Sequence, residues 1–134
     1  MEIDHVAIVV KDLEATLRLY TQTLGFTEVY REIIDDQGVE AVGLEAGPSF
    51  VELLLPLDER SSIARFRGDA PTKLHHTAYR VYDIEAKLAD LKGKGVQLID
   101  EHARRGAYGS LIAFLHPKAT GGVLIELCQP HPLR

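Results

Sequence analysis

The fold is decided by a stretch that occurs twice, HVAIVVKDLEATL at residues 5–17 and HTAYRVYDIEAKL at residues 76–88. Each copy starts with a histidine in an apolar segment that is typical of a strand, and continues into an aspartate that precedes a helical pattern. Further along, VELLLP at 51–56 is echoed by IELCQP at 125–130. Each copy therefore also ends with a glutamate inside an apolar strand. The chain is predicted to be a duplication of one structural unit.

Both halves are predicted to fold as a strand, a helix and three strands. The first half has expected strands at 3–10, 26–34, 40–46 and 50–55 and a helix at 12–24. The second has expected strands at 75–81, 96–100, 110–115 and 122–128 and a helix at 83–94. The predicted fold class is α+β, with two tandem βαβββ modules. Because about 65 residues bury little core alone, we expect a single domain, 1–134, with module 1 at about 1–56, a linker at about 57–74 and module 2 at about 75–130.

Composition restricts the classes of function. The chain has 134 residues, 46% of them hydrophobic and 26% charged, and a net charge of −5. The acidic balance argues against a nucleic-acid partner, and no apolar run is long enough to span a membrane. The single cysteine, Cys128, excludes an internal disulfide, and the N-terminal residues lack the pattern of a secretory signal. We therefore expect a cytoplasmic protein without a nucleic-acid or membrane partner.

Four residues are candidate metal ligands: His5, Glu52, His76 and Glu126. A lone histidine or glutamate on a strand is usually structural or exposed, but here the same pair recurs at matching places in both copies. A carboxylate inside an apolar strand is costly unless it is paired or bound to metal. Two imidazoles and two carboxylates suit a first-row divalent ion, with Co²⁺, Ni²⁺, Mn²⁺ and Zn²⁺ as alternatives.

This duplicated pattern resembles the vicinal-oxygen-chelate superfamily, which contains glyoxalases, bleomycin-resistance proteins and dioxygenases, over essentially the whole chain. Within it, several segments resemble the methylmalonyl-CoA epimerases: ELLLPL at 52–57, SIARF at 62–66, HH at 75–76, GAYG at 106–109, FLHPK at 114–118 and GVLIEL at 122–127. The resemblance implies metal-dependent interconversion of (R)- and (S)-methylmalonyl-CoA through an enolate. It also implies that the two modules form a cupped mixed sheet around a metal site. An acyl-CoA substrate, a bound divalent ion, with Co²⁺ favoured, and a homodimer are further implications of the resemblance.

The resemblance also assigns roles to individual residues. Glu126 is expected to be a metal ligand that also moves a proton, and Glu40 is the nearest match to a second acid–base group on the opposite side of the substrate. Lys118, Ser110 and His116 are candidates for substrate binding.

Other members of the same superfamily supply the alternative functions. A glyoxalase I-type lactoylglutathione lyase would use the same four ligands on a thiol hemithioacetal, but the HPKATGG turn at 116–122 differs from the Asp-Pro-Asp-Gly turn of that enzyme. An extradiol dioxygenase normally uses two histidines and one carboxylate, so the additional Glu52 argues against it. A drug-binding module of this fold would be non-enzymatic and would bind no metal.

Overall fold

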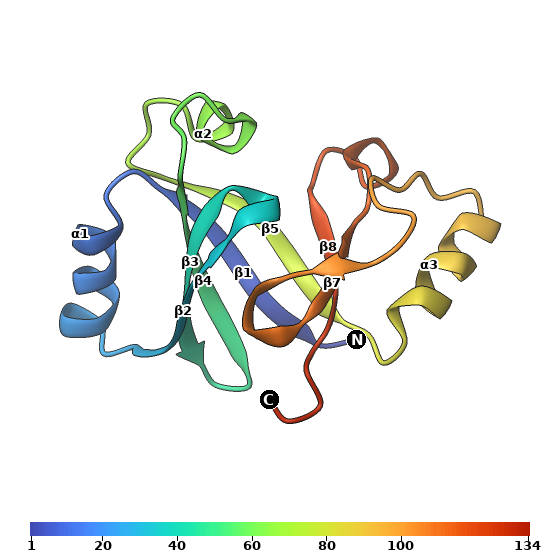
Figure 1. Ribbon diagram of the computed structural model, residues 1–134, viewed down its shortest axis with the longest axis horizontal. Coiled ribbons are helices and arrows are strands. Elements are labelled where there is room, and N and C mark those ends of the chain that lie inside the picture. Colours follow the sequence, from blue (N-terminus) through green and yellow to red (C-terminus); the bar gives the residue numbers. More distant parts are fainter. The chain divides into compact units, whose positions relative to one another are not determined.

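The structure is a computed structural model that describes all residues, 1–134, and it contains two compact units (Figure 1). One unit comprises residues 5–75, and the other comprises residues 1–4 together with 76–134. Along the chain, each set of elements runs strand, helix and three strands. This order confirms the α+β class and the βαβββ repeat. None of the helices is long and apolar enough to cross a membrane.

The first unit contains four strands and the helices between them. Its elements are β1 (Ile3–Val10, of which residues 5–10 belong to this unit), α1 (Leu13–Arg18), η1 (Leu19–Thr23), β2 (Thr27–Ile34), η2 (Asp35–Gln37), β3 (Val39–Ala46), β4 (Ser49–Pro56) and α2 (Ser62–Arg67). The strand order is β2-β3-β4-β1, in which β1 runs parallel to β4 and the other neighbours are antiparallel.

The predicted first helix begins where expected, although its second half has a different geometry. The Asp12 carboxylate accepts a hydrogen bond from the Ala15 amide at 3.0 Å, which caps the helix. After Arg18 the chain continues as a π-helical stretch. Gly25 follows with φ of 85°, a conformation that glycine adopts without steric cost.

The second unit repeats the arrangement. Its elements are β5 (Thr72–Arg80, of which residues 76–80 belong to this unit), α3 (Ile84–Gly93), β6 (Arg104–Arg105), η3 (Ala107–Gly109), β7 (Leu111–Phe114), η4 (Pro117–Ala119) and β8 (Ile125–Gln129). The strand order is β5-β8-β7-β6, with β5 parallel to β8. Asp83 caps α3 by accepting from the Ala86 amide at 3.1 Å, the counterpart of the Asp12 cap.

The predicted strand at 96–100 is wrong. In the structure this segment makes only an isolated bridge, between Leu98 and Leu115. The Asp100 carboxylate accepts a hydrogen bond from the Phe114 amide at 2.8 Å, and the amides of Ile99 and Asp100 both donate to the Phe114 carbonyl. The Asp100 side chain thus accepts the hydrogen bond that a backbone carbonyl would accept in a regular β-ladder. The short β6 pairs with β7 instead.

In each unit the helix covers one face of the sheet (Figure 1). Leu13 and Leu17 of α1 pack against Val42, Leu44 and Leu53 of the strands. In the second unit, α3 contributes Ile84 and Leu88 to a core with strand residues of β7 and β8. Because successive strand residues point to opposite faces, Glu52 lies on the face away from α1 when Leu53 faces the helix.

Candidate functional site

The first unit contains a buried histidine–glutamate pair. His5 and Glu52 are only 5% and 4% exposed, and the His5 Nε2 lies 3.9 Å from the Glu52 Oε1. The pair is set by the parallel register of β1 and β4, in which Ala7 lies opposite Glu52. The small side chain of Ala7 leaves room for the imidazole two residues earlier on the same face of β1.

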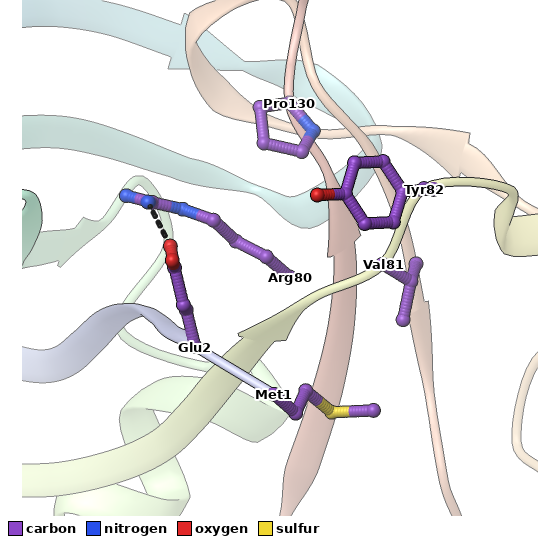
Figure 2. A pocket seen from close by; sticks show the side chains of 6 residues that line it. All are labelled: Met1, Glu2, Arg80, Val81, Tyr82 and Pro130. Carbon is purple, nitrogen blue, oxygen red and sulfur yellow. Dashed lines mark hydrogen bonds and ion pairs between the residues drawn. The ribbon is translucent and has the colours of Figure 1, made fainter.

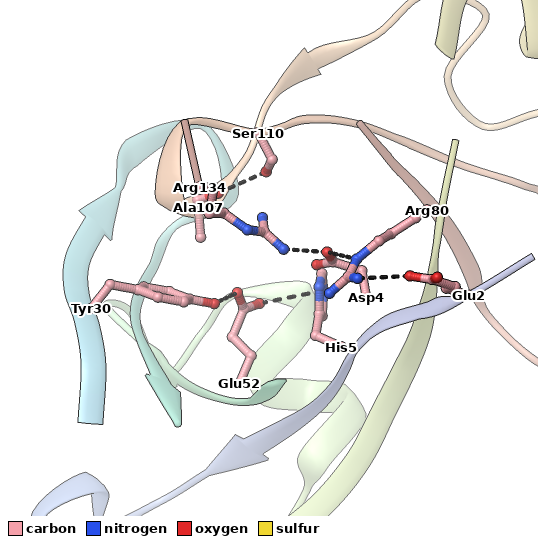
Figure 3. A network of polar contacts seen from close by, with 9 residues as sticks. All are labelled: Glu2, Asp4, His5, Tyr30, Glu52, Arg80, Ala107, Ser110 and Arg134. Carbon is pink, nitrogen blue, oxygen red and sulfur yellow. Dashed lines mark hydrogen bonds and ion pairs between the residues drawn. The ribbon is translucent and has the colours of Figure 1, made fainter. Parts of the chain in front are cut away.

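A hydrogen bond from Tyr30 holds the Glu52 carboxylate (Figure 3). The Tyr30 hydroxyl donates to Glu52 Oε2 at 2.6 Å, while Oε1 is the oxygen directed toward His5. Tyr30 lies on β2, two strands away from Glu52, and Gly43 of β3 is between them in the register. The Tyr30 ring lies across β3 at this glycine.

The second unit holds the equivalent pair, from β5 and β8. His76 and Glu126 are 3% and 2% exposed, and the His76 Nε2 lies 3.2 Å from the Glu126 Oε2. Ala78 is opposite Glu126 in the parallel register, as Ala7 is opposite Glu52. The residue opposite Glu126 on β7 is Phe114, whose ring makes an edge contact with the His76 imidazole at a centroid distance of 5.1 Å.

The donors of both pairs fit a divalent metal ion. Two donors that each bind one ion at about 2.1 Å lie about 3 to 4 Å apart, depending on the angle between the bonds. The nitrogen–oxygen distances of 3.9 Å in the first pair and 3.2 Å in the second fall in this range. A buried carboxylate next to an imidazole is also costly unless charge or coordination compensates its desolvation. Imidazole and carboxylate are ligands that first-row divalent ions accept.

The structure does not bring Glu40 to the face of the sheet that carries Glu52. Glu40 is opposite Leu55 in the β3–β4 register, and Leu55 packs on the core beneath α1. The Glu40 carboxylate accepts from the Arg31 Nε at 3.0 Å, and the hydrogen bonds that Arg31 donates to Glu14 and Glu40 hold the pKa of its guanidinium above the ordinary value. Glu40 is therefore part of a charged cluster on the helix side.

Two carboxylates of the hairpin, Glu32 and the exposed Glu45, share the face of Glu52. Glu32, the less exposed of the two, is half-buried and lies opposite Ala41. Tyr30, two residues earlier on the same strand, lies opposite Gly43. A bulge between Glu28 and Tyr30 shifts the register, so that residues 30 and 32 point away from α1. Strict alternation from the start of β2 would have placed both on the helix side. Neither residue is among those predicted from the sequence.

The predicted substrate-binding residues lie on two tight turns of the second unit. Ser110 is buried, and its hydroxyl donates to the Ala107 carbonyl at 2.7 Å. The His116 Nδ1 accepts from the Lys118 amide at 3.1 Å, which caps the turn, while Lys118 itself is exposed. These contacts give Ser110 and His116 structural roles in their turns. A role in substrate binding stays a prediction for all three.

A buried ionic network, also missed by the sequence analysis, lies at the start of β1 (Figure 3). Asp4 is 1% exposed and accepts from the Arg80 Nε at 3.0 Å, and it is also paired with Arg134. Arg80 additionally donates to Glu2 at 2.9 Å. Burial, reinforced by the charge of Asp4, raises the pKa of the Cys128 thiol, so this cysteine remains protonated at neutral pH.

Beside this network is a pocket of about 360 Å³ in the second unit (Figure 2). Arg80 points across it to Glu2, and the exposed Tyr82 ring lies near Pro130; Met1 and Val81 complete the lining. None of these residues is a predicted site residue, and the pocket adds no donor to the two histidine–glutamate pairs.

Comparison with known proteins identifies the family. The sequence profile of the Glyoxalase/Bleomycin resistance protein/Dioxygenase superfamily matches residues 4–114. The chain belongs to this superfamily. The chain is also similar to the ethylmalonyl-CoA/methylmalonyl-CoA epimerase of Cereibacter sphaeroides. The two sequences are 39% identical over 129 residues, which cover 95% of this chain and 96% of that protein.

Two solved structures from the superfamily agree with this relationship. The methylmalonyl-CoA epimerase from Mycobacterium tuberculosis has a TM-score of 0.91 and 42% identity, covering 98% of this chain and 89% of that one. A variant of the Streptomyces coelicolor methylmalonyl-CoA epimerase, in complex with 2-nitronate-propionyl-CoA, has a TM-score of 0.92 and 36% identity, covering 98% and 96%. These similarities show that the chain is an enzyme of the epimerase class.

Proposed function

We propose that this enzyme is a divalent-metal-dependent methylmalonyl-CoA epimerase, with His5, Glu52, His76 and Glu126 as ligands of one ion. The observation that carries the proposal is the recurrence of a buried histidine–glutamate pair, at equivalent strand positions, in both copies of the repeat. Relatives that are similar over nearly their whole length act on, or bind analogues of, methylmalonyl-CoA. The glyoxalase alternative has no comparable support.

The reaction needs removal of an acidic proton and its return to the opposite face of the same carbon. The α-carbon of methylmalonyl-CoA is bonded to a thioester and a carboxylate, so loss of its proton places charge on the thioester oxygen. When bound, the metal ion supplies Lewis-acid stabilisation of that charge, which is worth several kcal/mol. The protein must then supply two acid–base groups, one for each face of the carbon.

Glu126 is the proposed acid–base group among the ligands. The Glu52 carboxylate is held through Oε2 by the Tyr30 hydroxyl, with Oε1 directed toward His5, so its orientation is fixed. Glu126 is next to the apolar ring of Phe114 and near His76. The residue that faces Glu126 from the neighbouring strand is thus an apolar ring, in contrast to the hydroxyl that holds Glu52.

Glu32 is the proposed second acid–base group, in place of Glu40. It shares the face of the sheet with Glu52, whereas Glu40 points to the helix side, where Arg31 binds it. A half-buried carboxylate on that face is positioned to approach a ligand held at Glu52. The backbone register is the support for this choice.

Proton NMR in D₂O tests the function. The metal-loaded enzyme is incubated with methylmalonyl-CoA and, separately, with methylglyoxal and glutathione. We expect solvent deuterium to enter the α-position of the first substrate, with the exchange lost after metal removal by a chelator and restored by Co²⁺. Conversion of the hemithioacetal alone would assign the glyoxalase reaction instead.

A further inference from the structure

We infer that Tyr30 is a positioning residue that fixes which oxygen of Glu52 faces the metal ion. We also infer that Gly43 is needed because it leaves the space through which the Tyr30 ring reaches Glu52. The inference rests on the proposed function for the presence of the ion. It begins with three residues that are side by side on β2, β3 and β4: Tyr30 is opposite Gly43, and Gly43 is opposite Glu52. Residues directly opposite one another in a sheet share a face, so all three are on the face away from α1.

The glycine is required by the position of the ring. A Cβ atom at residue 43 would lie 1.8 Å from the Tyr30 Cε2 and 2.2 Å from Cζ, both far inside any contact distance. Neighbouring strands are about 4.8 Å apart, so a side chain on β2 must cross β3 to reach β4. Only the absence of a side chain at residue 43 leaves that path open. The ring then brings its hydroxyl to Glu52 Oε2 at 2.6 Å.

The ring is itself held in place. Phe50 of β4, two residues before Glu52, contacts the Tyr30 ring edge-to-face at a centroid distance of 6.1 Å. The β-bulge before Tyr30 turns the residue toward this face. Packing, the bulge and the glycine therefore fix the hydroxyl before any ligand binds.

The consequence for Glu52 is a fixed division between its two oxygens. Oε2 accepts the hydrogen bond from Tyr30, and Oε1 is directed toward the His5 Nε2. A carboxylate that is held in this way presents one oxygen to an ion, in a single orientation. Groups that hold metal ligands in this way typically change metal affinity by about 10- to 100-fold when they are removed.

The test compares metal affinity in matched variants by calorimetric titration with Co²⁺, together with the visible absorption spectrum of the Co²⁺ protein. Tyr30→Phe keeps the ring and its packing but removes the hydroxyl, and we expect it to weaken Co²⁺ binding about 10- to 100-fold and to alter the spectrum. Tyr20→Phe makes the same chemical change in a residue that packs on Phe26, and it should bind Co²⁺ like the wild type.

Gly43→Ala gives an independent test, because the new methyl group must displace the ring. We expect a loss of affinity similar to that of Tyr30→Phe. Adding Tyr30→Phe to Gly43→Ala should then cost little more, because the hydroxyl has already left Glu52. Gly93→Ala, where a Cβ meets open space, is the control for the glycine change.

Wild-type affinity and spectrum in Tyr30→Phe would overturn the inference, as would fully additive losses in the double variant. Failure of the proposed function is a different result: the wild type binds Co²⁺ and depends on Tyr30, yet catalyses no exchange at the α-carbon of methylmalonyl-CoA. A wild type that binds no divalent ion would overturn both.

Discussion

The two copies of the repeat place the same donors at the same strand positions but surround them differently. Ala7 is opposite Glu52 and Ala78 opposite Glu126, each in a parallel pair of strands. On the other side of each glutamate the copies differ, because Gly43 faces Glu52 and Phe114 faces Glu126.

That single difference determines what each carboxylate contacts. In the first copy, the glycine admits the Tyr30 ring from the next strand, and its hydroxyl binds Glu52. In the second copy, the residue facing the glutamate is itself aromatic, and it presents an apolar ring to His76. The duplicated scaffold thus places the same donors in both copies, whereas the residue facing each glutamate differs. We propose that this difference makes Glu52 a held metal ligand and Glu126 the group that moves protons.

The largest effect is expected from exchanging each carboxylate for its amide. Glu126→Gln should lower kcat by about 10²- to 10⁴-fold even at saturating metal, because it removes an acid–base group. Glu52→Gln should mainly weaken metal binding and regain most of its activity when Co²⁺ is raised. Steady-state epimerisation rates, measured over a range of Co²⁺ concentrations, separate the two effects. Equal kcat losses at saturating Co²⁺ would remove the proposed difference between the copies.

The second comparison concerns the hairpin of the first copy. Glu32→Gln should reduce kcat by about 10²-fold or more, since it removes the second acid–base group, whereas Glu40→Gln should leave kcat near the wild-type value. Deuterium incorporation into each epimer of the substrate is the measurement. The reverse ranking would show that the register does not determine which glutamate acts.

A smaller effect tests whether the helices of the two copies are equivalent. Asp12 and Asp83 each accept a hydrogen bond from the amide three residues later. Replacement of either by alanine should lower the free energy of unfolding by about 1 kcal/mol, as measured by urea denaturation. A much larger loss at Asp12 would show that the π-helical stretch after α1 depends on this cap more than α3 depends on Asp83.

The smallest effect is expected at Cys128, where the first copy has Leu54. Because burial raises the pKa of the Cys128 thiol, the thiol stays protonated between pH 7 and 9. Native protein should therefore react negligibly with a thiol-specific reagent in this pH range. Unfolded protein, in which the thiol regains its ordinary pKa, should react rapidly. Rapid reaction of the native protein would mean that β8 opens more readily than its burial indicates.

The parts of this structure that repeat could be predicted from the sequence. The matched histidines, the aspartate that precedes each helical pattern and the matched glutamates predicted the βαβββ order and the strand positions of the four proposed ligands. A repeat supplies two observations of each feature, which outweighs the ambiguity of any single residue.

The parts that do not repeat could not be predicted. The bulge in β2 reverses the alternation at Tyr30 and Glu32, and nothing in the local sequence marks it. The Asp100 side chain replaces a backbone acceptor, which turned a predicted strand into an isolated bridge. Both features depend on which segments pair, and such long-range pairing is absent from local patterns.

The most direct test of the account is the metal content of the purified protein and of His5→Ala and His76→Ala. If the two histidine–glutamate pairs serve one ion, the wild type binds one divalent ion per chain, and either substitution, one in each copy, abolishes stoichiometric binding while the fold persists by circular dichroism. Two ions per chain, or one ion retained in either variant, would contradict the claim that both copies of the repeat build a single metal site.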